Sequence, residues 1–134
     1  MTKRTAFPTV SLIASILGIA IIIFLFTVPR NYLMSVTYKM RAAALNAYNA
    51  VLDGNFETTD KNISDMCEVL EQSEKTLKLF LNHEDVDELR ASLHSAQALS
   101  LIEESGNLIT ELQDIIRILN YWDDSETLNI YNLF

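Results

Sequence analysis

The chain opens with an uninterrupted apolar stretch. No charged residue lies between Thr5 and Pro29, and residues 9–28 read TVSLIASILGIAIIIFLFTV, a run of twenty. At a rise of ~1.5 Å per residue, such a helix spans ~30 Å, the thickness of a bilayer's hydrocarbon core. We therefore predict a single transmembrane helix over 9–28, after a short flank at 1–8. Its anchoring side chains are Val10, Leu12, Ile13, Ile16, Leu17, Ile19, Ile21, Ile22, Ile23, Phe24, Leu25, Phe26 and Val28.

Two other interpretations of this run fit its length and composition less well. A cleaved signal peptide has an apolar region of about 7–15 residues followed by a small-x-small cleavage site. Here the run is longer and ends in FTVPRNYL, which offers no such site. A buried core helix of a soluble protein would be shorter and less uniformly apolar. We interpret the run as an uncleaved anchor.

After the anchor, apolar residues recur every three or four positions, the spacing of amphipathic helices. Pro29 either opens a new helix or kinks the continuing one. A first segment is expected over 30–52, and Gly54 suits a left-handed C-cap. Its apolar line is Leu33, Val36, Met40, Ala43, Ala47 and Ala50, widened by Leu45, Tyr48 and Leu52.

A second helix is predicted over 59–81, capped by Thr58, Thr59 or Asp60. Its apolar line is Ile63, Met66, Leu70, Ser73, Leu77 and Phe80, with Cys67 and Leu81 beside it. A third helix follows the N-cap Asn82 and presents Val86, Leu89, Leu93 and Ala96. The sequence SLIE at 100–103 has the form of a capping box, which favours a fourth helix from Ser100. The alternative places the turn at 105–107.

The fourth apolar line is Leu101, Ser105, Leu108, Leu112, Ile115, Leu119 and Trp122. The sequence DDSETLNIYNLF is interpreted as a tail that leaves the helix, with Leu128, Ile130, Leu133 and Phe134 folding back onto the bundle. Four amphipathic segments with short connections predict an all-α protein. The transmembrane helix would be followed by an up-down antiparallel four-helix bundle domain over 30–134.

Charge constrains the partners. The whole chain has a formal net charge of −8. Without Lys3 and Arg4, residues 30–134 hold eight basic and eighteen acidic residues, a net charge of −10. Such a domain repels nucleic acid, so nucleic acid is not an expected ligand. A short N-terminus with a basic pair usually stays inside, so we expect the bundle outside the cytoplasmic membrane.

The stretch LNHEDVDELRASLH, residues 81–94, is the strongest candidate for chemistry. His83, Asp85, Asp87 and Glu88 are weak candidates for a divalent-cation site. His94 lies eleven residues from His83, or ~16 Å along a helix, so the two cannot share one metal ion. Carboxylates in a first helical turn also have a structural explanation, because the helix dipole favours them there.

Other catalytic arrangements are missing from the sequence. No glycine-framed serine elbow or phosphate-binding loop is present, and Cys67 has no local basic partner. We therefore expect no catalytic residue and no cofactor.

Three quoted stretches resemble a known family. TLKLFLNHEDVDELRASLHSAQALS, ITELQDIIRIL and TLNIYNLF are similar to the bacterial family numbered 4363 among domains of unknown function. The similarity covers roughly residues 35–134. The matching positions are Asn82, His83, Val86 and Asp87, then Glu111, Leu112 and Ile115, then Leu128, Asn129 and Ile130. The resemblance implies a membrane-anchored, outward-facing helical protein and no assigned activity.

These observations favour a non-enzymatic interaction or scaffold module. It would contact the lipid bilayer through residues 9–28 and bind an unknown protein or itself. The alternative is a ligand- or cation-sensing module outside the cytoplasmic membrane.

Overall fold

The computed structural model describes residues 6–131, with side chains over 9–124, and every regular element in that range is a helix. The helices are α1 (Ala6–Leu52), α2 (Phe56–Phe80), α3 (His83–Leu101) and α4 (Ser105–Tyr131). The chain divides into two compact units, Met1–Tyr32 and Leu33–Phe134, and α1 contributes to both. The predicted all-α fold is confirmed.

The first unit holds the apolar part of α1. Large apolar side chains within 10–28 are 47–68% exposed, so they have no protein core to enter. By length and composition, this helix is able to cross a membrane. The Ser15 hydroxyl donates to the Ser11 carbonyl at 2.9 Å, and the Thr27 hydroxyl donates to the Ile23 carbonyl at 2.6 Å. Both hydroxyls are thus satisfied within the helix, as a water-free surrounding requires.

Pro29 lies inside α1, so no new helix begins there. Of the two sequence alternatives, the continuing helix is the correct one. Proline has no N–H to donate to the carbonyl of Leu25, four residues earlier, and its ring crowds that carbonyl. The loss of one hydrogen bond disturbs a helix of 47 residues only locally.

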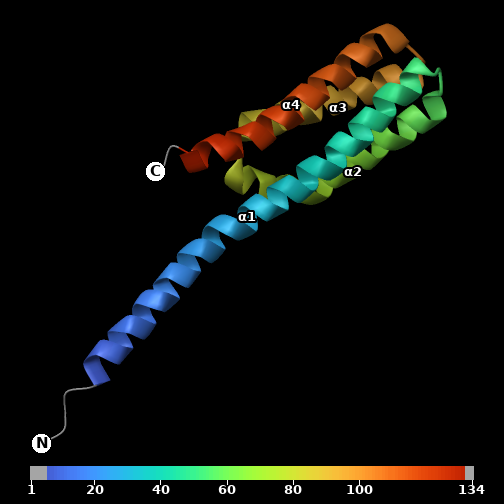
Figure 1. The fold of residues 1–134 in the computed structure, drawn as a ribbon. Coiled ribbons are helices and arrows are strands. Elements are labelled where there is room, and N and C mark those ends of the chain that lie inside the picture. Colours follow the sequence, from blue (N-terminus) through green and yellow to red (C-terminus); the bar gives the residue numbers. More distant parts are fainter. Residues whose placement is uncertain (1–5, 132–134) are drawn as a thin grey trace, which may run out of the picture. The chain divides into compact units, whose positions relative to one another are not determined.

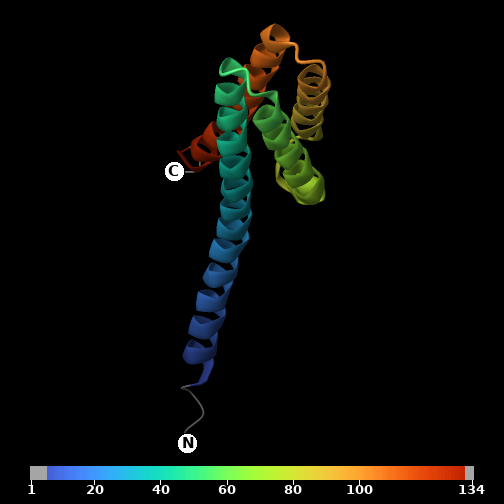
Figure 2. The same cartoon turned by 90° about the vertical axis from the view of Figure 1, so that its right-hand side faces the viewer.

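The second unit is an antiparallel four-helix bundle made from residues 33–52 of α1 together with α2, α3 and α4. The chain runs up, down, up and down through these helices (Figures 1 and 2). Helix α3 packs against both α2 and α4. Helix α4 also meets α1, because Arg41 forms an ion pair with Asp123 at 3.0 Å and Gln113 donates to the Tyr48 hydroxyl at 3.5 Å.

The core consists of one apolar stripe from each helix. Trp122 is its largest side chain and is fully buried, as predicted. Three alanines on α1 allow close approach of the neighbouring helices. The buried apolar residues are Leu33, Val36, Met40, Ala44, Ala47, Ala50 and Val51 on α1, Ile63, Met66, Leu70 and Leu77 on α2, Val86, Leu89, Leu93 and Ala96 on α3, and Leu108, Leu112, Ile115, Ile118, Leu119 and Trp122 on α4.

Some residues of the predicted stripes lie elsewhere. Ala44 is fully buried, whereas Ala43 is only half-buried. The buried stripe of α1 therefore passes through Ala44 and not through the predicted Ala43. Leu45 and Leu52 are exposed and do not widen the stripe. Phe80 is also exposed, because α2 ends at this residue and no further turn covers it. These four predictions are wrong.

Helix α2 begins earlier than predicted, at Phe56. Asn55 caps it, since its side-chain oxygen accepts a hydrogen bond from the Thr58 N–H at 3.0 Å. The Asn55 N–H also donates to the Ala50 carbonyl at 2.8 Å, and Gly54 has φ +71°. These contacts form a Schellman motif, which confirms the left-handed cap at Gly54. The caps predicted at 58–60 are wrong because Asn55 serves both helices.

The turn between α3 and α4 also lies at a different position from the one predicted. Helix α3 continues to Leu101, so Ser100 is a buried residue of α3 and caps nothing. Its side chain continues the buried stripe of α3. Because serine is polar, the sequence pattern suggested that the stripe ended before this position. The turn covers 102–104, between the two predicted positions, which were a helix start at Ser100 and a turn at 105–107. Glu103 adopts φ +54°, and its N–H donates to the Ser100 carbonyl at 3.1 Å.

Helix α4 begins at Ser105 and ends at Tyr131, and both bounds differ from those predicted. The Glu104 carboxylate accepts a hydrogen bond from the Asn107 N–H at 2.8 Å and so caps the helix. The helix continues to Tyr131, so the predicted departure of the tail after Trp122 is wrong. Asp123, the first residue of the predicted tail, forms an ion pair with Arg41 of α1. The predicted fold-back contacts of Leu128, Ile130, Leu133 and Phe134 lie outside the described side chains.

Candidate functional site

The acidic stretch that suggested chemistry forms the start of α3. Leu81 is extended, with φ −106° and ψ 159°, and this ends α2. The Asn82 side chain then accepts a hydrogen bond from the Glu84 N–H at 3.2 Å, which confirms Asn82 as the N-cap. His83 is the first helical residue and is exposed.

Basic side chains engage two of the candidate carboxylates. The Lys78 amino group lies 2.8 Å from Asp87 Oδ1, and an Arg117 guanidinium nitrogen lies 3.6 Å from Glu88 Oε1. Asp85 and Glu88 line an open cavity of about 190 Å³ between α3 and α4, and Arg117 lines it too. A guanidinium at this position opposes a bound cation. Among the described residues, no three His, Cys, Asp or Glu side chains converge as a metal site would require.

Four alternating charges join α2 to α3. Lys78 contacts Glu74 at 2.9 Å as well as Asp87, and Arg90 pairs with both Glu74 and Asp87. We call Glu74, Lys78, Asp87 and Arg90 the charge network. Sequence analysis did not identify it, because α2 and α3 contribute two members each.

The charge network shifts the pKa values of Glu74, Lys78 and Asp87. The hydrogen bond from Lys78, followed by the one from Arg90, lowers the pKa of Glu74. The hydrogen bond from Lys78 lowers the pKa of Asp87, and the hydrogen bond to Asp87 raises the pKa of Lys78. All three shifts favour the charged forms, so the network carries ion pairs at neutral pH.

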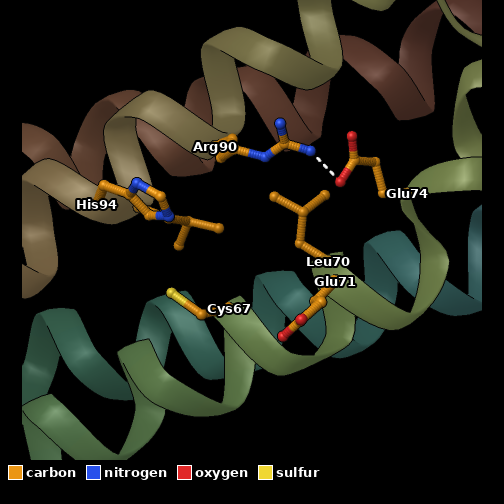
Figure 3. Close-up of a pocket in the computed structure, with 7 residues that line it drawn as sticks. Cys67, Leu70, Glu71, Glu74, Arg90 and His94 are labelled. Atoms are coloured by element: carbon orange, nitrogen blue, oxygen red, sulfur yellow. Dashed lines mark ion pairs between the residues drawn. The ribbon is translucent and has the colours of Figure 1, made fainter.

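An open groove of about 330 Å³ adjoins the network between α2 and α3 (Figure 3). It is lined by Cys67, Leu70, Glu71, Glu74, Arg90, Leu93 and His94. In Figure 3, Cys67 and His94 face the groove from opposite helices. On its own helix, His94 has no partner of matching chemistry, and Cys67 is 27 residues away in the sequence. The signal missed from the sequence was the antiparallel pairing of α2 with α3.

The Cys67 thiol is not activated in this groove. Partial burial, followed by the negative charge of Asp60, raises its pKa. A thiol with a raised pKa holds less thiolate at neutral pH and is a weaker nucleophile. Glu74 and Arg90, the closest pair of charges in the groove, engage each other (Figure 3). The groove therefore provides an open concave surface with a histidine in its wall, but its cysteine is not an activated nucleophile.

Exposed apolar side chains occur at both ends of the bundle. Leu79 is 76% exposed and Phe80 is 41% exposed, at the turn between α2 and α3. At the opposite end, Leu52 is 57%, Leu101 is 72% and Ile102 is 70% exposed, beside the other two turns. We call Leu79 and Phe80 the entry-end pair, because the up-down course places their turn at the end where α1 enters the bundle (Figure 2). Leu52, Leu101 and Ile102 are the far-end patch.

Comparison with family models supplies a match over most of the chain. Residues 27–133 match the family described as Domain of unknown function (DUF4363). The chain belongs to the DUF4363 family. The matched residues begin at the end of the apolar run and take in α2, α3 and nearly all of the bundle. Searches of curated proteins and of solved structures found no match.

The structure explains why the DUF4363-like pattern at the start of α3 has its spacing. Asn82 caps the helix, Val86 is fully buried and Asp87 pairs with Lys78. In α4, Glu111 accepts a hydrogen bond from the Ser95 hydroxyl at 2.9 Å. Leu112 and Ile115 are fully buried, whereas the side chains of 128–130 lie outside the described ones. The described members of the pattern thus have structural roles.

Proposed function

We propose that this DUF4363 protein is a single-pass, membrane-anchored interaction module without enzymatic activity. The observation that carries the proposal is the exposure of 47–68% along the large apolar side chains of residues 10–28. Fully burying an exposed side chain of this size contributes ~1.5–3 kcal/mol, and these thirteen are 47–68% exposed, so together they represent roughly 10–25 kcal/mol. That is at least as large as the ~5–15 kcal/mol net stability of a typical domain, so this surface needs a cover. A bilayer supplies it.

The short N-terminal flank with its basic pair supports an orientation, whereas the basic residues on the two sides of the span are nearly balanced, because Arg30, Lys39 and Arg41 follow it. Lys3 and Arg4 precede it and favour an inside N-terminus. We propose that the bundle, with its net charge of −10, lies outside the cytoplasmic membrane. Protease added to cells stripped of their outer layers should then digest the bundle and leave the N-terminus protected. Protection of the bundle until the membrane is opened would reverse this assignment.

Anchoring is tested on the full chain in membranes. The protein should stay with the membrane fraction after extraction with alkaline carbonate, and its mature N-terminus should precede the span. Release by carbonate, or a mature chain that begins after Val28, would refute the anchor. A variant with Ile16→Lys and Ile22→Lys provides the control, because charges in the centre of a span oppose insertion.

The far-end patch is the part of the bundle we assign to a protein partner or to a second copy of the chain. Apolar side chains with this exposure, away from the entry end, are typical of contact sites. A photo-crosslinking residue at Leu101 should capture a defined partner, and Ile102→Asp should abolish that capture. A crosslinker at Gln72, which is exposed on the side of α2, is the matched control. Equal capture from both positions would count against the assignment.

A ligand-sensing module is the second candidate, and the groove beside His94 is the observation that favours it. Calcium, zinc and the chelator EDTA should then shift the thermal midpoint of the full chain in detergent. His94→Ala should remove any shift that arises in the groove, and His83→Ala serves as the control. Midpoints that do not move with any of these additions would argue against cation sensing.

A further inference from the structure

The entry-end pair consists of two apolar side chains that are exposed and lie outside the core of the bundle. Leu79 is 76% exposed, more than any other large apolar side chain described. Phe80 follows as the last residue of α2, and Leu81 leaves the helix in an extended conformation. The neighbouring Leu77 is fully buried, so α2 already has its core contact in this turn. The pair therefore requires a different explanation.

Topology fixes which end of the bundle carries this pair. Helix α1 rises from Leu33, and α2 returns antiparallel to it, so the turn that follows Phe80 lies at the same end as Leu33 (Figures 1 and 2). Leu33 is five residues after Val28, the last residue of the apolar run. Five residues span at most ~18 Å even when fully extended. Chain length alone thus keeps Leu33 within about 18 Å of the last residue of the apolar run.

Other side chains at this end have matching character. Met34 is 45% exposed and Tyr38 is 73% exposed, and both lie in the first turns of α1 beyond Leu33. Residues four apart share one face of a helix, so these two side chains project together. Aromatic and apolar side chains with a polar tip or neighbour favour the boundary between lipid and water.

We propose that the entry-end pair rests in the interfacial region of the bilayer that α1 spans. The inference rests on the proposed membrane anchor, and it adds a second lipid contact in the bundle itself. Two contacts, one through α1 and one through the turn after α2, restrict tilting of the bundle relative to the membrane. The far-end patch is then held away from the lipid, where a protein can reach it.

Site-specific labelling of the full chain in phosphatidylcholine vesicles tests the proposal. Cys67→Ser removes the single cysteine, and an environment-sensitive fluorophore is attached at Leu79→Cys, Leu101→Cys or Ile22→Cys in turn. Leu101 is the matched control, because it is also a leucine in the last turn of a helix and is 72% exposed. We expect blue-shifted emission and protection from aqueous iodide at Leu79 and Ile22. The Leu101 label should emit in water and be quenched by iodide, and a protein-to-lipid ratio of at most one chain per vesicle prevents a second copy from covering it.

The outcomes separate the two proposals. If the label at position 22 is in lipid but the labels at 79 and 101 are both in water, the interfacial contact is refuted and the anchor is retained. A label in water at 22 would overturn the anchor and the contact that depends on it. Lipid contact at 101 as well as at 79 would show that the bundle lies flat, which also overturns the proposed end-on contact.

A second measurement avoids replacement of Cys67. A photo-crosslinking residue at Leu79 should attach to lipid in the same vesicles, whereas one at Leu101 should not. Phe80→Asp should reduce lipid capture from position 79, because a charged side chain beside the label opposes entry into the interface. Undiminished capture in that variant would refute the role of the pair. Helical circular dichroism confirms that each variant remains folded.

Discussion

Replacing Glu103 with glycine should stabilise the folded bundle. Two similar turns close the far end of the bundle, one at Gly54 with φ +71° and one at Glu103 with φ +54°. An L-residue in this left-handed region costs ~1–2 kcal/mol, whereas glycine adopts it freely. Glycine also loses ~0.5–1 kcal/mol of additional backbone entropy on folding, so Glu103→Gly should gain a net ~0.5–1 kcal/mol.

The converse exchange should destabilise the chain. No atom lies within 4 Å of a Cβ built at Gly54, so Gly54→Ala meets no steric obstacle and probes the backbone conformation alone. We expect Gly54→Ala to cost ~1 kcal/mol. For a domain of this size, 1 kcal/mol corresponds to about 4–8 °C in the thermal midpoint.

The assay follows Trp122, the single tryptophan, whose fully buried ring reports unfolding of the bundle by fluorescence. Guanidinium titrations of the full chain in mild detergent give the free energy of unfolding. Glu103→Gln is the control, because it removes the charge and keeps the backbone constraint. If Glu103→Gly lowers the midpoint, or Glu103→Gln raises it as much as glycine does, the backbone explanation is refuted.

Three further predictions concern the charge network, the α1 stripe and the groove. Stability should fall as pH drops through the lowered pKa of Asp87, below its ordinary value of 3.8, and as pH rises through the raised pKa of Lys78, above 10.5. Lys78→Met should remove the alkaline loss in unfolding midpoints recorded across pH, and a loss that persists would contradict the pairing. Ala44→Leu overpacks a fully buried site and should cost ~1–3 kcal/mol in guanidinium titrations, whereas Ala42→Leu at an exposed site should change stability by less than ~0.5 kcal/mol. Maleimide should modify Cys67 more slowly than it modifies a free thiol at neutral pH and faster as pH rises, because burial raises the pKa of Cys67. Rapid labelling at neutral pH would contradict that shift.

The main features of the fold were accessible from sequence because they depend on repeated signals. Apolar residues at helical spacing identified four helices, and most of the stripes hold the observed core. Helix boundaries were predicted wrongly where the prediction depended on a single polar side chain. Ser100 was interpreted as a helix start, although it occupies a core position of α3. Glu103 occupies a left-handed position that usually belongs to glycine, so the real turn lacked its expected marker.

The candidate site was harder to predict because its contacts cross between helices. Local spacing placed Asn82 correctly as a cap, since its partner is two residues away. The partners of Asp87 and Glu88 on other helices are Lys78 on α2 and Arg117 on α4. Those pairings depend on how far each helix slides along its neighbour, which apolar periodicity does not specify. The groove between Cys67 and His94 was missed for the same reason.

The ion pair between Arg41 and Asp123 has a consequence for biosynthesis. The two residues are 82 positions apart, and they join the first helix of the bundle to the last. During synthesis, α2 and α3 are complete before Asp123 has been made. The side of α1 that faces α4 therefore stays uncovered until the final helix emerges, and premature termination before Asp123 would release a chain with that surface open to chaperones and proteases.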